Sequence, residues 1–175
     1  MRDGDALEHN PHITRSALEA MHDQLFGWAL SRCSFDRAAA EDLMQQAYVE
    51  LLSGRARFDR RSSLKTFVFA VVQNLARSRF RRLASRLRLV SRYEQELPAG
   101  QADPGFVESR SDVWHAVHRL PPRQRDIIEL VFCRDMTVEE ASTVMGVSVG
   151  TGRVHYDRAK KALRNNLRQF ADIAE

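Results

Sequence analysis

The chain has 175 residues, of which 43% are hydrophobic and 29% are charged, and its formal net charge is +4. This composition indicates one or two small globular domains and excludes a wholly disordered chain. The longest apolar runs fall far short of the roughly 20 residues that span a bilayer, and the N-terminus has no secretory h-region, so we expect a cytoplasmic protein without membrane insertion.

Helices joined by short loops are the expected architecture, because eight glycines and five prolines are few for a turn-rich β fold. Apolar residues recur every three or four positions over residues 14–33, which predicts a first core helix. Asp36 is expected to cap a second helix that ends at Ser53-Gly54, and a third helix starts at Leu64. The inward side chains expected on the second and third helices are Leu43, Met44, Ala47, Tyr48, Leu51, Leu52, Leu64, Phe67, Val68, Val71, Val72, Leu75 and Phe80.

The charge is unevenly distributed along the chain. Residues 1–53 hold 4 basic and 9 acidic side chains, whereas residues 54–92 hold 12 basic side chains and one acidic one. Such a basic block favours a surface that binds a polyanion, with an arginine-rich solvated helix as the alternative. Residues 93–110 are acidic, contain two prolines and two glycines, and lack periodicity, so we interpret them as a flexible linker.

A second helical domain is expected over residues 111–175. Val113, Trp114, Val117 and Leu120 indicate a short helix, and Pro121-Pro122 opens the next, which carries Ile127, Ile128, Leu130, Val131 and Phe132. Thr137 and Glu140 have the spacing of a capping box. Gly146 is expected to end that helix and Ser148 to cap the last one, which predicts a helix-turn-helix.

In a helix-turn-helix the second helix lies in the DNA major groove. Between residues 153 and 168 the chain has six basic side chains and one acid, Asp157, which suits duplex DNA. The alternative is a helical hairpin with no DNA role. On this helix the expected buried positions are Val149, Gly152, Tyr156, Ala159 and Leu163, and the expected DNA-facing residues are Ser148, Thr151, Arg153, Val154, His155, Arg158 and Lys161.

Three segments together resemble a known family. AEDLMQQAYVELL at 40–52, FDRRSSLKTFVFAVVQNLARSRFRR at 58–82 and the stretch from LPPRQR to the R-A-K-K-A-L tail at 120–163 are similar, in order and spacing, to the extracytoplasmic-function sigma factors of bacterial RNA polymerase. The resemblance implies an all-α fold of two small helical domains: a three- or four-helix region 2 bundle over 14–92, after an N-terminal tail at 1–13, and a region 4 helix-turn-helix bundle over 111–175. It implies that region 2 binds the polymerase clamp and melts the promoter, and that region 4 reads the minus-35 element.

The resemblance also implies roles for individual residues. Core polymerase binding is assigned to residues of the second helix: Asp42, Gln45, Gln46 and Glu50. Recognition of the minus-10 element is assigned to the loop and third helix: Phe58, Arg61, Ser62, Ser63, Lys65, Thr66, Asn74, Arg77 and Arg81. Holding an unpaired base requires an aromatic wall and an amide that reads the base edge, for which we choose Phe58 and Asn74. A core phenylalanine and a surface asparagine are the alternatives.

Four positions depart from the family pattern. Gln46 stands where a glutamate is more frequent, Phe67 where a tryptophan is usual, and His155 where an arginine is usual. Gly152 replaces a valine or isoleucine on the buried side of the recognition helix, where glycine costs about 1 kcal/mol of helix stability. Gly152→Val is therefore expected to stabilise the isolated C-terminal domain.

The implied partners are core RNA polymerase, through the clamp of the β′ subunit and the flap of the β subunit, promoter DNA, and an anti-sigma factor. The histidine pairs 9/12 and 115/118 have no further ligands nearby, so we expect no metal or cofactor, and no catalytic motif indicates an enzyme. Cys33 and Cys133 are expected to be buried, reduced thiols. Two other functions stay open: a helix-turn-helix regulator that acts without polymerase, and a sigma-like decoy that titrates an anti-sigma factor.

Overall fold

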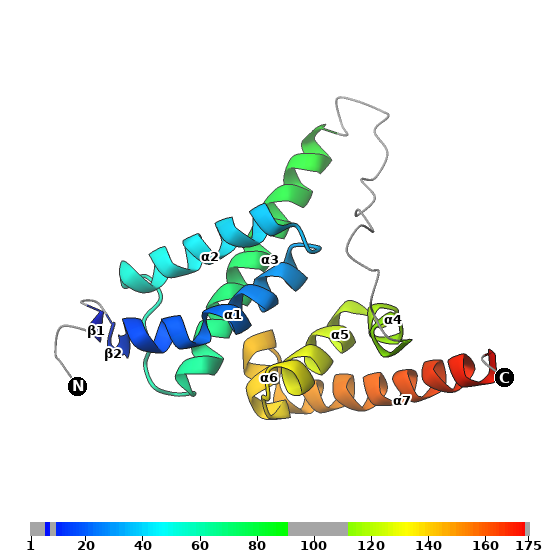
Figure 1. The fold of residues 1–175 in the computed structure, drawn as a ribbon. Coiled ribbons are helices and arrows are strands. Elements are labelled where there is room, and N and C mark those ends of the chain that lie inside the picture. Colours follow the sequence, from blue (N-terminus) through cyan, green and yellow to red (C-terminus); the bar gives the residue numbers. More distant parts are fainter. Residues whose placement is uncertain (1–5, 8–9, 91–111, 174–175) are drawn as a thin grey trace. The chain divides into compact units, whose positions relative to one another are not determined.

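The computed structural model describes residues 6–7, 10–90 and 112–173 of the chain, with side chains over 10–85 and 113–167. The chain forms two compact units, 1–102 and 103–175 (Figure 1). We call them unit 1 and unit 2. The expected linker, 93–110, lies outside the described residues.

Unit 1 begins with a short hairpin that the sequence pattern does not anticipate. β1 (Ala6–Leu7) pairs antiparallel with β2 (Asn10–Thr14), and β2 leads directly into the helix α1 (Arg15–Arg32). Thr14 caps α1, because its hydroxyl accepts a hydrogen bond of 3.1 Å from the amide of Ala17. Ile13 is fully buried, so the end of the segment expected to be a tail contributes to the core of unit 1.

Three helices make the bundle of unit 1. Asp36 caps α2 (Arg37–Leu52) through the amide of Ala39 at 3.0 Å, as predicted, and α3 is Leu64–Val90. All three helices contact one another, and the rings of Trp28 and Phe69 meet in the core with centroids 6.3 Å apart. The other fully buried large side chains of the bundle are Ile13, Leu25, Leu43, Leu51, Val68 and Val72.

Two side chains expected in this core are exposed instead. Phe80 is 72% exposed because the C-terminal half of α3 runs beyond the ends of α1 and α2 (Figure 1). Leu52 is 51% exposed, since Leu51 takes the inward position of the last turn and the next residue lies about 100° further round the helix. Both predictions were wrong: for Phe80 the periodic pattern continues past the end of the covering helices, and for Leu52 the neighbouring Leu51 occupies the inward position.

Unit 2 consists of four short elements and one long helix. They are α4 (Asp112–His118), α5 (Pro122–Ile128), the π-helix η2 (Glu129–Cys133) and α6 (Val138–Met145), and the long helix is α7 (Val149–Ile173). α7 contacts α4, α5 and α6. One cluster in this core is buried between α4, α5 and α7, and it consists of Val117, Leu120, Ile128 and Ala159, flanked by Tyr156, Ala162 and Leu163.

Two arginines of the LPPRQR motif bind main-chain carbonyls near the C-terminal ends of α4 and α6. The guanidinium of Arg125 donates to the carbonyls of His118 at 2.6 Å and Leu120 at 3.2 Å, which are at and just after the C-terminal end of α4. Arg123 donates to the carbonyl of Met145 at 3.3 Å, at the end of α6. These bonds satisfy carbonyls that a helix end leaves without an intrahelical partner, so this part of the motif has a structural role.

The helix-turn-helix forms as predicted. Thr137 and Glu140 make both bonds of the capping box at the start of α6, and Gly146 ends that helix in the left-handed conformation with φ 62°. The Ser148 hydroxyl accepts the amide of Thr151 at 3.1 Å and so caps α7. The turn between the helices is therefore fixed by local hydrogen bonds at both of its ends.

Gly152 was expected to leave a missing side chain in the core, but it allows a close approach of α7 to Ser142 of α6. A Cβ placed there would lie 1.9 Å from Oγ and 3.0 Å from Cβ of Ser142, which is itself fully buried on α6. The Ser142 hydroxyl is held by the carbonyl of Val138 at 2.6 Å. Gly152 leaves no gap, because Ser142 fills the space, so the expectation that Gly152→Val stabilises this domain was wrong.

Four further apolar side chains of unit 2 are exposed, of which only Val149 was expected to be buried: Val113, Trp114, Phe132 and Val149. Val113 and Trp114 lie in the first turn of the seven-residue α4, and Val149 opens α7 at the turn. Phe132 lies in η2, where hydrogen bonds reach one residue further than in an α-helix and the spacing of three and four residues no longer tracks one face.

The predicted all-α fold of two helical domains is confirmed, with the β1–β2 hairpin as an addition. Among the residues that the structure describes, no helix combines the length and apolar character needed to cross a bilayer.

Candidate nucleic-acid interface

The loop that enters α3 carries the aromatic part of the predicted minus-10 site. Phe58 is half-buried, and its ring lies against that of Phe67 with centroids 5.1 Å apart and planes inclined by 37°. Arg61 is exposed beside Asp59, with 3.0 Å between guanidinium and carboxylate. The backbone of Arg60, between them, is left-handed with φ 62°. This turn holds the basic tip of the loop outward while Phe58 packs on α3.

The hydroxyl residues of the predicted site take part in capping α3. The Ser63 hydroxyl accepts the amide of Thr66 at 3.1 Å and shares a second hydrogen bond of 2.8 Å with the Thr66 hydroxyl. Thr66 is only 1% exposed. Its side chain therefore fixes the first turn of α3 and is not on the surface. Ser62 and Lys65 are half-buried next to this cap.

A polar stripe follows α3 away from the loop. Asn74, Arg77 and Arg81 recur at three and four residues, so they share one side of the helix, and the whole stripe spans about 10 Å of axis. Asn74 and Arg81 are exposed and Arg77 is half-buried. Beside Arg81 is a shallow hollow of about 440 Å³ lined by Ser78, Arg81, Arg82 and Ser85. Two guanidinium groups and two hydroxyls around an open hollow are donors suited to phosphate oxygens.

The start of α7 carries the other predicted DNA contacts. Arg153, Val154, Arg158 and Lys161 are exposed, and His155 is half-buried. Arg153 is paired: its guanidinium lies 2.7 Å from the carboxylate of Glu139 in the first turn of α6. This hydrogen bond lowers the pKa of the Glu139 carboxyl below its usual value. The pair joins the two helices of the motif across its outer surface.

The remaining polar groups near the turn are partly engaged. Ser148 and Thr151 share a hydroxyl hydrogen bond of 2.9 Å within the cap of α7. Lys160 lies 3.1 Å from the carboxylate of Asp157 and 4.3 Å from the centroid of the Tyr156 ring. Lys160 therefore binds within its own helix, while Arg158 and Lys161 extend from α7 into solvent.

The outer face of α2 holds the residues predicted for polymerase. Asp42, Gln45 and Gln46 are exposed, and Glu50, which is half-buried, pairs with Arg55 at 3.1 Å. Sequence reasoning missed Val49 and Leu52, which continue the same stripe at helical spacing and are about half exposed. Their exposure depends on where the bundle ends, so hydrophobicity alone could not reveal it.

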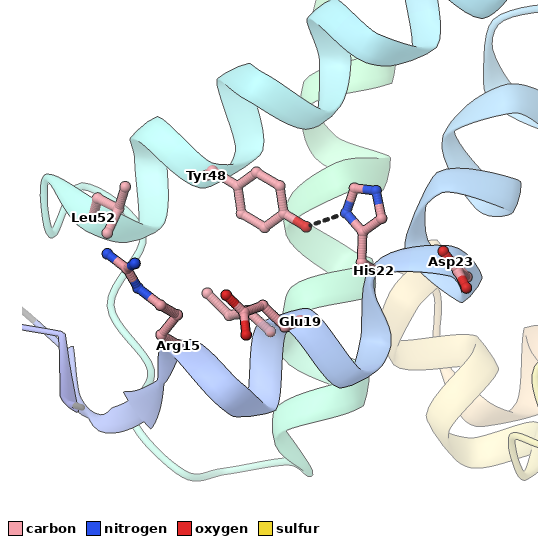
Figure 2. A pocket seen from close by; sticks show the side chains of 7 residues that line it. Arg15, Glu19, His22, Asp23, Tyr48 and Leu52 are labelled. Atoms are coloured by element: carbon pink, nitrogen blue, oxygen red, sulfur yellow. Dashed lines mark hydrogen bonds between the residues drawn. The ribbon is translucent and has the colours of Figure 1, made fainter. Parts of the chain in front are cut away.

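A groove of about 480 Å³ borders this stripe between α1 and α2. Figure 2 shows Arg15, Glu19 and His22 of α1 facing Tyr48 and Leu52 of α2. His22 Nδ1 and the Tyr48 hydroxyl share a hydrogen bond of 2.8 Å, and burial raises the pKa of Tyr48 above its usual value. The groove thus extends the exposed face of α2 with an apolar floor and charged edges.

Cys33 and Cys133 are free thiols, and each is half-buried where full burial was expected. Cys33 follows the last turn of α1, and Cys133 ends η2. Burial raises the pKa of both thiols above the usual range. Among the described residues, no group of three or more metal-ligating side chains comes together.

Alkylation by iodoacetamide is expected to be slow for both cysteines at pH 7.5, because a raised pKa keeps the thiol protonated and only the thiolate reacts. The rate is expected to keep rising above pH 9 in the folded chain. Mass spectrometry of the folded and urea-unfolded chain measures both rates, with Cys33→Ser and Cys133→Ser assigning each site. Fast alkylation at neutral pH in the folded chain would contradict the raised pKa of the two thiols.

Comparison with known proteins agrees with this arrangement. The family model "Sigma-70 region 2" matches residues 17–86, and "Sigma-70, region 4" matches residues 110–163. The ECF RNA polymerase sigma factor SigC of Mycobacterium tuberculosis is 28% identical over 138 residues, which cover 78% of this chain and 74% of the relative. SigF of Caulobacter vibrioides is 27% identical over 168 residues, or 95% of this chain and 89% of the relative.

A solved structure shares the fold. It is the sigma factor RpoE of Bartonella quintana, solved in complex with the anti-sigma factor NepR, with a TM-score of 0.68 and 23% identity over 88% of this chain and 96% of that one. Both family regions occur here in order, each on its own helical unit, and the relatives match across both. The chain belongs to the extracytoplasmic-function sigma factors of the sigma-70 family.

Proposed function

We propose that this chain binds core RNA polymerase and directs it to specific promoters, where unit 1 melts the minus-10 element and unit 2 reads the minus-35 element. The observation that carries the proposal is the presence, in one chain, of two different basic surfaces: the stripe on α3 and the start of α7. In this proposal region 2 spans 14–92, region 4 spans 111–175, and 93–110 joins them. The protein acts in the bacterial cytoplasm, as an initiation factor and not as an enzyme.

The α3 surface suits single-stranded DNA. Phe58, in the loop before α3, packs against Phe67 and offers an aromatic face to an unstacked base. Asn74 offers an amide about two turns along α3 from Phe67. The hollow beside Arg81 and Arg82 is the place for backbone phosphates. Ser63 and Thr66 support this site by fixing the start of α3, which keeps the loop and the helix in one orientation.

The start of α7 suits duplex DNA. Arg153, with its planar fork, can pair with both major-groove acceptors of a guanine, and Val154 can pack against a thymine methyl group. Arg158 and Lys161 are placed for phosphates. Glu139 holds the Arg153 guanidinium in the free protein, so reading DNA requires this ion pair to be exchanged for the base.

The exposed face of α2 is proposed as the contact for the polymerase clamp. Its polar side chains, Asp42, Gln45 and Gln46, and the apolar Val49 and Leu52 form one stripe that leads into the groove next to α1. Such a stripe offers a partner helix both apolar area and specific hydrogen bonds. In unit 2, the exposed ring of Phe132, stacked on Tyr156, is a candidate contact for the β flap.

Control by an anti-sigma factor is proposed from the similar structure of RpoE with NepR. A stand-alone regulator would not need the polymerase face on α2, and a decoy for an anti-sigma factor would not need the α3 hollow. Run-off transcription tests the proposed function against both alternatives: with core polymerase, this chain is expected to initiate at promoters selected by the reconstituted holoenzyme from genomic DNA. A folded chain that binds core and never initiates would refute the proposed function.

Asp42→Ala and Asn74→Ala are expected to affect different steps. Asp42 is on the exposed face of α2, so its loss should weaken core binding, while Asn74 is on the α3 stripe, so its loss should slow promoter opening. Each loss is expected to be about tenfold in its own step, since a hydrogen bond from or to a charged or reading group contributes about 1.5 kcal/mol. Core affinity by fluorescence anisotropy and opening by permanganate reactivity measure the two steps; equal effects of both variants would refute the assignment.

A further inference from the structure

Asn10 is a buried polar residue that is far in sequence from the residues proposed to contact DNA and polymerase. It lies in β2, before the first residue matched by the region 2 model, and its side chain is only 3% exposed. A buried carboxamide must make hydrogen bonds to offset its lost hydration. Its partners therefore indicate what it does.

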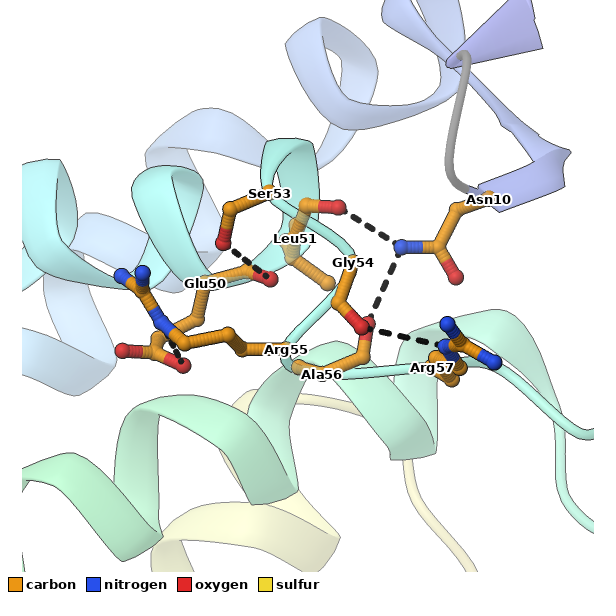
Figure 3. Close-up of polar contacts among 8 residues, drawn as sticks. All are labelled: Asn10, Glu50, Leu51, Ser53, Gly54, Arg55, Ala56 and Arg57. Carbon is orange, nitrogen blue, oxygen red and sulfur yellow. Dashed lines mark hydrogen bonds and ion pairs between the residues drawn. The ribbon is translucent and has the colours of Figure 1, made fainter.

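All three side-chain bonds of Asn10 go to the main chain of residues 51–58, which covers the end of α2 and the start of the loop toward α3. Its Nδ2 donates to the carbonyl of Leu51 at 2.6 Å and to the carbonyl of Ala56 at 3.0 Å (Figure 3). Its Oδ1 accepts the amide of Phe58 at 3.0 Å. One side chain thus binds the last turn of α2 and two points of the following loop, which are 41 to 48 residues away in sequence.

Few other side chains could make this set of contacts. Two donors and one acceptor at the end of a short stem are the inventory of asparagine, since aspartate lacks the donors and serine has one. The loop has local bonds of its own. The Ala56 amide donates to the Glu50 carbonyl at 3.0 Å. Arg57 donates to the Gly54 carbonyl at 3.3 Å (Figure 3). Among the residues that the structure describes, it is Asn10 that binds the amide of Phe58, through its Oδ1.

We propose that Asn10 is a positioning residue for the minus-10 site: by holding the main chain from Leu51 to Phe58, it sets the place from which the Phe58 ring packs on Phe67 and faces an unpaired base. This role rests on the proposed function of the loop. In this role Asn10 links the β1–β2 hairpin to the residues that are proposed to open the promoter. The effect of Asn10 on the Phe58 ring is direct, because the amide that Asn10 binds is the amide of Phe58 itself.

The first test is hydrogen exchange by mass spectrometry on the full chain. Asn10→Leu keeps the number and branching of the side-chain heavy atoms and removes all three bonds, so the amides of 56–58 are expected to exchange about tenfold faster, while those of α1 and the first turns of α2 keep their rates. Ile13→Val and Ile13→Ala, in the same strand and fully buried, are the controls that loosen the hairpin without touching the loop. Unchanged protection at 56–58 in Asn10→Leu would overturn the proposal.

The second test uses the holoenzyme with core polymerase at promoters that it selects from genomic DNA. Asn10→Leu is expected to shorten the lifetime of the open complex about tenfold and to leave core affinity unchanged, whereas Ile13 variants of equal melting temperature keep the lifetime. An equal loss in both would reduce Asn10 to a stabilising residue. If Asn10→Leu fails to fold, Asn10→Asp, which keeps the acceptor for Phe58 and loses both donors, takes its place. A wild-type chain that opens no promoter refutes the proposed function, while hydrogen exchange still decides whether Asn10 holds the loop.

Discussion

Gly152→Val is expected to lower the free energy of unfolding of unit 2 by about 2 to 3 kcal/mol, the usual cost of overpacking a filled core. The first added carbon meets Ser142 at 1.9 Å, and Ser142 cannot move its hydroxyl without breaking its bond to Val138. In a unit of this size the loss corresponds to about 10 °C or more in melting midpoint. Hydrogen exchange of the α6 and α7 amides in the full chain measures it.

Gly150→Ala is the matched control for this change. Gly150 is exposed on the same helix, and the nearest atom to its added Cβ is the Ser148 hydroxyl at 3.9 Å. Here alanine is expected to stabilise the helix by about 0.5 to 1 kcal/mol, the difference in helix propensity. Gly152→Ala combined with Ser142→Ala is expected to recover part of the loss caused by Gly152→Ala alone. Gly152→Val as stable as the wild type would show that α6 and α7 can separate at no cost.

Arg153→Ala is expected to weaken binding of the holoenzyme to its selected minus-35 duplex by roughly 10- to 100-fold, the range for loss of a bidentate base contact. The reason is that Arg153 is exposed at the start of α7 and presents a fork suited to guanine. Selectivity at one base pair should relax. If Arg153 contacts only phosphate, all sequences weaken equally and the salt dependence falls by about one unit of slope. Fluorescence anisotropy at several salt concentrations distinguishes the two results.

Two control variants separate this reading role from charge in general. Glu139→Gln breaks the 2.7 Å ion pair and removes a negative charge near DNA, so affinity is expected to rise a few-fold. Lys160→Ala removes a positive charge that already lies against Asp157 and the Tyr156 ring, so it is expected to have little effect. A drop with Lys160→Ala as large as with Arg153→Ala would contradict the assigned contact.

Features fixed by local hydrogen bonds were predictable from the sequence. Asp36 capping α2, the Thr137–Glu140 capping box and the left-handed Gly146 each depend on residues within a few positions of one another. The helix-turn-helix followed from them. The division into two helical units was predictable from the apolar periodicity and the charge of each segment. Both patterns extend over many residues, so single exceptions do not obscure them.

Features set by distant contacts could not be predicted. The bonds of Asn10 reach more than forty residues along the chain, and the fit of Gly152 against Ser142 depends on how closely two helices approach. Phe80 has the right spacing for a core residue, but α3 is longer than the helices that cover it. Within the candidate site, the pairing of Arg153 with Glu139 and the burial of Thr66 required the tertiary structure. The assigned DNA and polymerase contacts stay predictions.

The π-helix η2, between α5 and α6, affects how well this part of the chain tolerates the deletion of one residue. A π turn accommodates one residue more than an α turn. Deleting one residue within Glu129–Cys133 converts that turn to α-helix over nearly the same span. The same deletion inside α5 rotates its flanking residues relative to each other by about 100° and moves Ile127 or Ile128 off the core. A single-residue deletion in η2 therefore disturbs the orientation of the helix-turn-helix less than the same deletion in α5.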